Sequence, residues 1–404
     1  MRKILITMAL LAVTGFAFAQ KGNVKEAKRI ATNAGDFNNA EKLIGEALVN
    51  AETKDDPETW NVAGFVQQKY NEDEMKKAYL NQKYDTTRVY NSVLKMFEYY
   101  LKCDDMAQIP NSKGKVKNKY RKNNSNVLLV DRPNLINGGI HFFNNGENEH
   151  ALDFFSTYVE STFHPIFEGK DLAKKDTLLS QTAYFASLAA VKVEDYEKVI
   201  KYAPYAKEDP EVGGYALEFL SLAYEATGDT AQWVATLKEG LLKHRDNAYF
   251  FGNLIDYYNR NELYDEAMAF ADGMINENPE NAFAVYVKGF LYHNMKDYDK
   301  AIEFYKKTIE IDPTYSEAYS NIGLVYSIQG QDFSATATND INDPQYAKDQ
   351  ETLKNFYKEA KPYYEKAREL EPDNSQLWLQ GLYRVYYMLD MGAEFEEIEK
   401  LMQQ

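Results

Sequence analysis

The chain has a single cysteine, Cys103, among its 404 residues. One cysteine cannot form an internal disulfide, so packing must hold the fold together, and we expect Cys103 to be a buried apolar side chain on its helix. A thiol nucleophile is the alternative, and no sequence motif supports it. Histidine is also scarce, and no metal-ligand spacing relates the five that occur, which are His141, His150, His164, His244 and His293.

Catalytic and metal-binding motifs are missing as well. The sequence has no HExxH, CxxC, GxSxG or phosphate-loop pattern. The polar run 339–343 lacks the glycine and the distal glutamate of an EF-hand, so it predicts a capping turn. We therefore predict that the protein is not an enzyme and uses no metal and no cofactor. The alternative is an enzyme whose site lies in the inserted segments 103–131 or 327–357, and no group of residues there supports it.

Residues that break regular structure are few, with 11 prolines and 21 glycines, and no long low-complexity tract occurs. Because 45% of the residues are hydrophobic and 14% are aromatic, the chain has ample material for a packed interior. Its length exceeds the usual size of one compact core. The composition therefore favours several domains or one elongated array of repeats.

Basic residues are outnumbered, with 46 Lys and Arg against 62 Asp and Glu and a formal net charge of −16. A surface of this sign repels polyanions, so nucleic acid is excluded as a partner. One stretch, residues 113–122, nevertheless holds six basic side chains. We interpret it as a solvated loop or one that pairs with the protein's own carboxylates. Contact with an anionic glycan or a membrane head group is the alternative.

The N-terminus has the pattern of a secretory signal peptide. Arg2 and Lys3 precede an apolar run, which ends in the small-residue pattern Ala17-Phe18-Ala19. We predict a signal peptide over residues 1–19 and export to the periplasm or the extracellular space. The run is short for a membrane span, so an uncleaved anchor is the weaker alternative, and we expect no transmembrane segment after cleavage. Gln20 stands where a lipoprotein has its cysteine, which argues against a lipid anchor.

A fixed interval of 34 residues runs through the C-terminal part of the sequence. It relates glycine, alanine, tyrosine and proline pairs, namely Gly289 to Gly323, Ala267 to Ala301, Tyr258 to Tyr292 to Tyr326, and Pro279 to Pro313. This period, with small and aromatic residues at set offsets, resembles the tetratricopeptide repeat, whose unit is two antiparallel helices and a turn. The resemblance implies an all-α fold, a right-handed α-solenoid superhelix of helix hairpins.

Within one unit we assign a role to each recurring residue. Gly289 lets the first helix approach its neighbour, Tyr292 fills the space beside it, and Ala301 keeps the crossing tight. Asp297 marks the turn between the helices, and Pro313 ends the second one. Steps of 34 residues predict that units begin near Ser180, Gly214, Ala248, Ala282 and Ser316.

This spacing divides the mature chain into two parts. Residues 20–179 are predicted to form degenerate helical repeats with insertions, in three looser units. Residues 180–404 are predicted to form the regular array, with an insertion at 327–351 that is followed by a long helix, bent at Pro362, to Leu370. The last unit begins at Ser375 and is interpreted as a cap, with its glycine, Gly381, one place earlier than the period requires.

The resemblance also implies which side chains face the concave groove. They occupy the second, fifth, ninth and twelfth places of each first helix, and aromatic residues recur at the second place. The predicted groove residues are Tyr184, Tyr215, Tyr249, Asp256, Asn259, Phe283, Tyr286, His293, Tyr383 and Tyr386. Such a ladder suits an extended peptide or a sugar chain. Packing between repeats is the alternative, because the chain has 32 tyrosines. The carboxylate-gripping residues of some family members are absent from these places.

Together these observations predict an exported, non-enzymatic scaffold that binds a protein or peptide partner in the groove. A cell-envelope glycan-binding protein of the helical-repeat type is the alternative function. The tyrosine content fits a glycan ligand, whereas the missing lipid-accepting cysteine does not.

Overall fold

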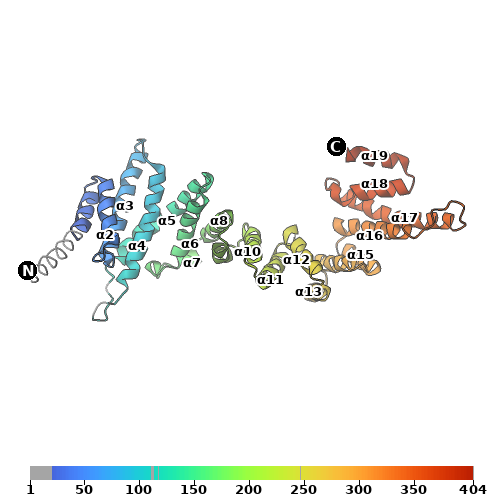
Figure 1. Ribbon diagram of the computed structural model, residues 1–404, viewed down its shortest axis with the longest axis horizontal. Coiled ribbons are helices and arrows are strands. Elements are labelled where there is room, and N and C mark those ends of the chain that lie inside the picture. Colours follow the sequence, from blue (N-terminus) through green and yellow to red (C-terminus); the bar gives the residue numbers. More distant parts are fainter. Residues whose placement is uncertain (1–20, 111–112, 117, 246, 404) are drawn as a thin grey trace, which may run out of the picture. The chain divides into compact units, whose positions relative to one another are not determined.

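The computed structural model describes residues 21–403 except 111, 112, 117 and 246. This part of the chain is helical and has no strand (Figure 1). The prediction of an all-α fold built from helix pairs is therefore confirmed. The predicted signal peptide, residues 1–19, lies outside the described residues.

Residues 21–32 are helical, and the labelled elements follow. Up to residue 243 they are α2 (Phe37–Val49), α3 (Pro57–Tyr79), α4 (Thr86–Ala107), α5 (Arg121–Asn144), α6 (Asn148–Thr162), η1 (Pro165–Phe167), α7 (Leu172–Lys175), α8 (Leu179–Lys192), α9 (Tyr196–Tyr202), η2 (Ala203–Tyr205), α10 (Gly213–Thr227) and α11 (Thr230–Lys243). The remainder are α12 (Ala248–Arg260), α13 (Tyr264–Glu277), α14 (Ala282–Asn294), α15 (Tyr298–Ile311), α16 (Ser316–Ser334), α17 (Tyr346–Leu370), η3 (Ser375–Leu377), α18 (Leu379–Met388) and α19 (Gly392–Met402).

The chain divides into two compact units, an N-terminal unit (Met1–Phe250) and a C-terminal unit (Phe251–Gln404). The boundary lies within α12, inside the segment 180–404 for which one array was predicted. Each unit has its own buried apolar clusters. Each unit is therefore held together by its own buried apolar side chains.

Short acidic turns start the second helix of a pair. Asp195 Oδ1 accepts a hydrogen bond from the Lys198 amide at 3.1 Å, and Asp297 Oδ1 accepts one from the Lys300 amide at 3.4 Å. These bonds satisfy amide donors that have no partner within the helix. Because only a few residues separate the helices of each pair, they pack antiparallel, as α14 with α15 and α10 with α11.

The helix starts follow the predicted period closely. The first helices α8, α10, α12, α14 and α16 each begin within one residue of the predicted unit starts. The agreement has a local cause, since helix caps and breakers recur every 34 residues and act within a few residues of themselves.

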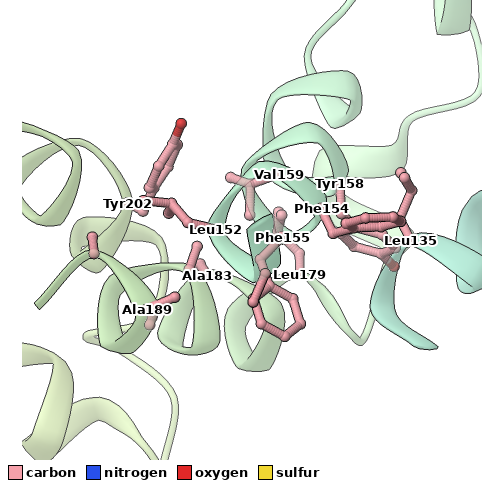
Figure 2. Packing of buried hydrophobic residues seen from close by; sticks show 14 of the residues in the cluster. Leu135, Leu152, Phe154, Phe155, Tyr158, Val159, Leu179, Ala183, Ala189 and Tyr202 are labelled. Atoms are coloured by element: carbon pink, nitrogen blue, oxygen red, sulfur yellow. The ribbon is translucent and has the colours of Figure 1, made fainter. Parts of the chain in front are cut away.

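The largest core of the N-terminal unit forms where α6 packs between α5 and α8 (Figure 2). Leu135 of α5, Phe155 of α6 and Ala183 of α8 are fully buried there. Small alanines on α8 let the larger rings of α6 approach closely, and burial of each large side chain stabilises the fold by about 1.5–3 kcal/mol. In the N-terminal part, as in a repeat, small side chains on one helix let large side chains of the neighbouring helix pack closely.

One role assigned from the sequence is wrong in detail. The space against Gly289 is filled by Tyr305, whose Cδ1 would lie 2.8 Å from a Cβ atom at that glycine. Tyr292 instead stacks on Phe304, with ring centroids 5.4 Å apart. Tyr305 reaches the glycine because it lies on the facing helix α15, whereas Tyr292 follows the glycine on α14 itself.

The predicted insertion is largely helical. Helix α16 continues to Ser334, so the irregular segment is only 335–345. The long helix α17 then runs from Tyr346 to Leu370 with Pro362 inside it, as predicted. Asp343 Oδ1 accepts a hydrogen bond from the Gln345 amide at 2.8 Å and so supports the turn before α17.

Candidate partner-binding cleft

The N-terminal unit carries a cleft of about 920 Å³ between α10 and the segment that joins α11 to α12. Two loop residues that precede α10 complete its rim. The lining residues are Pro210, Glu211, Gly214, Tyr215, Glu218, Leu242, Lys243, His244, Arg245, Asn247 and Ala248. A volume of this size falls in the range of about 300–1,000 Å³ that is usual for ligand sites.

Two apolar side chains stand exposed at this cleft. Tyr215 is 55% exposed and Leu242 is 43% exposed. Helix α10 buries the opposite face, with Ala216 and Leu220 in the core, so the exposed ring of Tyr215 is not needed to pack the helix. A large apolar side chain left in water beside a hollow is a feature of interaction surfaces.

Ion pairs hold the basic rim of the cleft in place. Lys243 Nζ lies 2.6 Å from Glu208 Oε1 and 2.9 Å from Glu239 Oε1. Burial raises the pKa of Glu239, but the hydrogen bonds from Lys207 and Lys243 outweigh it, and the pKa is lowered from its ordinary value. Glu239 is therefore ionised at neutral pH, and Lys243 has two carboxylate partners.

A second polar contact joins the two sides of the cleft. Asn247 Nδ2 donates a hydrogen bond to Glu218 Oε1 at 2.5 Å, which links the start of α12 to α10. The ring of His244 lies close to Gly214, where a Cβ atom would be 3.4 Å from Nδ1. The buried Nε2 of His244 has no hydrogen-bond partner within the described residues. Such an atom costs free energy unless a ligand or water supplies a partner.

One predicted groove residue, Tyr215, lines this cleft, and a second, Tyr184, lies beside it. Tyr184 lies beside Tyr215, with ring centroids 6.2 Å apart, and stacks on Phe219 at 5.7 Å. Tyr249 is half-buried, and its hydroxyl donates to Ser221 Oγ at 3.4 Å. Tyr184 is thus adjacent to Tyr215, the first rung of the predicted ladder, while the second rung, Tyr249, is held against α10.

Two predicted groove residues of the C-terminal unit lie in its core. Tyr286 is 8% exposed, and its hydroxyl accepts a hydrogen bond from Asn321 Nδ2 at 2.8 Å. Tyr386 is 4% exposed, and its hydroxyl donates to Glu365 Oε1 at 3.0 Å. These two tyrosines pack between helices, which is the alternative that the sequence left open.

The other predicted residues of the C-terminal unit lie nearer to its surface. Phe283 packs edge-to-face on Phe251 at 5.9 Å, Tyr383 contacts Phe395 at 4.8 Å, and Asn259 Oδ1 accepts from Asn294 at 3.5 Å. Asp256 is exposed and pairs with Arg260 at 3.4 Å. His293 is half-buried, and burial lowers its pKa. Their role in a groove stays a prediction.

Sequence reasoning missed the second wall of the cleft. Leu242, His244 and Asn247 come from the end of a second helix and the following turn, whereas the predicted places lie on first helices only. One signal was present. Leu241 and Leu242 are adjacent on one helix, and only Leu241 is buried. Neighbouring helical residues point about 100° apart, so two consecutive leucines can face different surroundings.

The basic stretch 113–122 is partly neutralised by the protein itself. Arg121 donates from Nε to Asp104 Oδ1 at 2.9 Å and from one terminal nitrogen to Oδ2 at 2.7 Å, and it also lies 3.5 Å from Glu168. This pairing agrees with the interpretation favoured from the sequence. Residue 117 of the stretch lies outside the described residues.

Cys103 is fully buried in α4, as predicted. Burial raises the pKa of its thiol to about 12, so the thiolate is not formed at neutral pH. The described residues contain no group of three His, Cys, Asp or Glu side chains placed to hold a metal ion. Over the same residues, no helix combines the length and the apolar character that a membrane span requires.

Comparisons with known proteins identify the repeats. Residues 282–315 and 304–337 match tetratricopeptide repeat families. Residues 282–337 therefore belong to the tetratricopeptide repeat class. The photosystem I assembly protein Ycf3 of Acaryochloris marina is 25% identical over 126 residues, which are 30% of this chain. The chain spans 66% of the length of that curated relative.

Two solved structures that align with part of this chain are also described as repeat proteins. A TPR repeats protein from Bacteroides fragilis is 20% identical and covers 64% of this chain and 99% of its own, with a TM-score of 0.34. The C-terminal part of a TPR repeat-containing protein from Cytophaga hutchinsonii is 15% identical and covers 66% of this chain and 93% of its own, with a TM-score of 0.35.

Proposed function

We propose that this chain is an exported, non-enzymatic scaffold that binds a protein or peptide partner, and that the cleft beside Tyr215 is part of the contact. The exposed pair Tyr215 and Leu242 on the rim of a 920 Å³ cleft carries the proposal. Tyrosine supplies a large contact area with few rotatable bonds, so it binds a partner at a small cost in side-chain entropy.

The neighbouring charges support a peptide rather than an apolar ligand. The cleft has acidic groups at Glu211 and Glu218 and basic groups at Lys243 and Arg245, so charged groups of both signs line the same cleft as the exposed apolar side chains. Protein interfaces commonly combine aromatic and apolar side chains with neighbouring polar groups. The tetratricopeptide class and a relative named as an assembly protein agree with this function.

A phage-displayed library of random peptides tests the proposal. Peptides enriched on the wild-type chain are synthesised with a fluorescent label, and their affinities are measured by anisotropy. We expect Tyr215→Ala to weaken binding about tenfold or more, because it removes the aromatic ring that a bound peptide would cover. The matched control is Tyr79→Ala, which removes a tyrosine that is 88% exposed in the same unit but does not line the cleft.

Equal affinities for Tyr215→Ala and Tyr79→Ala would show that the cleft is not the contact. A glycan array probed with the same variants separates the other ligand class. If glycans bind in a manner that depends on Tyr215 and no peptide is enriched, the ligand of the cleft is a sugar chain rather than a peptide.

Export is proposed from the N-terminal pattern alone. When the full gene is expressed in a secreting host, we expect the mature chain to begin at Gln20, which intact-mass measurement checks directly. Recovery of the chain with residues 1–19 still attached, in the cytoplasm, would overturn this part of the proposal.

A further inference from the structure

A second cleft, of about 240 Å³, lies within the C-terminal unit between α16 and α18. Helices α16, α17 and α18 and the short η3 helix contact one another around it. The ring of Tyr364 lines it and is 5% exposed. The cleft is smaller than the sites of about 300–1,000 Å³ that hold small molecules, so it fits a single side chain of a peptide.

The only charged side chain that lines this cleft is Arg384. The C-terminal unit has three arginines, and two of them have carboxylate partners. Arg260 lies 3.4 Å from Asp256, and Arg368 lies 2.6 Å from Glu397. Arg384 forms no ion pair within residues 251–403. Among the described residues, no acidic side chain lines the cleft, and Arg384 has no carboxylate partner. The cleft therefore has a local excess of positive charge, although the chain as a whole has a net charge of −16.

The neutral groups around Arg384 add hydrogen-bond donors. Gln376 and Gln380 line the cleft, and their side-chain amides have no hydrogen-bond partner within the described residues. The two serines at the cleft already use their protons. Ser320 Oγ donates to the Leu377 carbonyl at 2.6 Å, and Ser327 Oγ donates to the Gly323 carbonyl at 2.9 Å. The donors that remain are therefore the guanidinium and two amides.

Tyr364 brings no negative charge that would oppose an anion. Burial raises the pKa of its hydroxyl to about 12, so the ring stays neutral at physiological pH. An apolar ring beside a fork of donors suits the methylenes and the carboxylate of an acidic side chain. Arginine is well matched to a carboxylate, because its planar fork can donate two parallel hydrogen bonds to the two oxygens.

We infer that the cleft between α16 and α18 binds a carboxylate side chain of an acidic peptide segment, with Arg384 as its ion-pair partner and Gln376 and Gln380 as additional hydrogen-bond donors. This site is separate from the cleft at Tyr215 and does not depend on the function proposed there. It gives the C-terminal unit a preference for acidic partners, although the chain as a whole is acidic.

A fluorescein-labelled hexaglutamate peptide tests the site on the full chain at low ionic strength. Anisotropy should show binding to the wild type, and Arg384→Gln should weaken it about tenfold, as the loss of a charge-assisted pair predicts. Arg384→Lys should be intermediate, because it keeps the charge but not the fork. The matched control is Arg260→Gln, an equal change of charge in the same unit, which should leave binding unchanged.

Three results would overturn the inference. Hexaglutamine could bind as tightly as hexaglutamate, which would show that the carboxylate is not recognised. Arg384→Gln and Arg260→Gln could have equal effects, which would indicate only general electrostatics. Inorganic phosphate could bind in a manner that depends on Arg384 while hexaglutamate does not, which would make the ligand a phosphate. Circular dichroism of Arg384→Gln checks that this exposed substitution leaves the helices intact.

Discussion

Gly381 on α18 lies directly against the ring of Tyr364 on α17, so that a Cβ atom at the glycine would be 2.3 Å from Cε1 of the ring. Gly323 on α16 meets the same ring, with a distance of 2.8 Å from a Cβ atom to Cδ2. One buried tyrosine is therefore packed against glycines of two first helices. This explains why the last unit keeps a glycine although its position is shifted by one residue.

The first prediction follows from this contact. Gly381→Ala should lower the free energy of unfolding by about 1–3 kcal/mol, because the added methyl group overlaps Tyr364 and the helices must move apart. Urea unfolding followed by circular dichroism measures it. Gly273→Ala is the control, since nothing lies within 4 Å of a Cβ atom there, and an unstrained alanine in a helix should raise stability by about 0.5–1 kcal/mol. A Gly381→Ala variant as stable as the wild type would contradict the packing described.

A second prediction concerns a buried ion pair of the N-terminal unit. Arg132 lies 2.5 Å from Asp176, and both side chains are less than a tenth exposed. The guanidinium also lies over the ring of Tyr158 at 3.6 Å. Asp176→Ala should destabilise the N-terminal unit by about 3–5 kcal/mol, because it leaves the charge of Arg132 buried and unpaired.

The comparison for this pair is Asp256→Ala, which breaks an exposed pair with Arg260. We expect that change to alter the free energy of unfolding by less than about 1 kcal/mol. Thermal unfolding of both variants distinguishes the two cases. Similar losses in the two variants would show that burial does not govern the energy of the pair.

A third prediction concerns alkaline pH. Burial raises the pKa of Tyr364 and of Tyr258 from an ordinary value of 10.0 to about 12. Between pH 10 and pH 12 the unfolded chain loses these protons while the folded chain keeps them. The contribution of the two tyrosines to the free energy of unfolding is therefore fully present below pH 10, and it is lost as the pH rises through this window. Urea midpoints across the window measure the fall. Tyr364→Phe should show a smaller fall than the wild type, and an identical fall would exclude Tyr364 as a cause.

A fourth prediction concerns the thiol. Because the pKa of Cys103 is raised from 9.0 to about 12, the folded chain has about a thousandfold less thiolate than an exposed cysteine near neutral pH. Iodoacetamide should therefore label the native chain very slowly and the guanidinium-unfolded chain rapidly, as mass spectrometry can follow. Rapid labelling of the native chain would mean that Cys103 is accessible and would support the alternative that it is a reactive thiol.

The sequence by itself determined the helices and their period. Proline, glycine and short acidic residues act on the backbone within a few positions, so caps such as Asp195 and Asp297 place helix starts without knowledge of the rest of the fold. The burial of Cys103 also followed from local pattern. These features depend on short-range interactions, which are present in the residue order itself.

Only the tertiary structure decided which aromatic side chain packs where. Tyr305 rather than Tyr292 fills the space at Gly289, and Tyr286 belongs to the core whereas Tyr215 stands exposed. The order of residues does not distinguish these tyrosines, but a side chain is buried or left in water according to the helices that pack across it, and those contacts join residues far apart in the chain. Packing between helices also opened the cleft at Arg384, whose walls come from two successive units, and the cleft at Tyr215, which lies between α10 and the segment that joins α11 to α12.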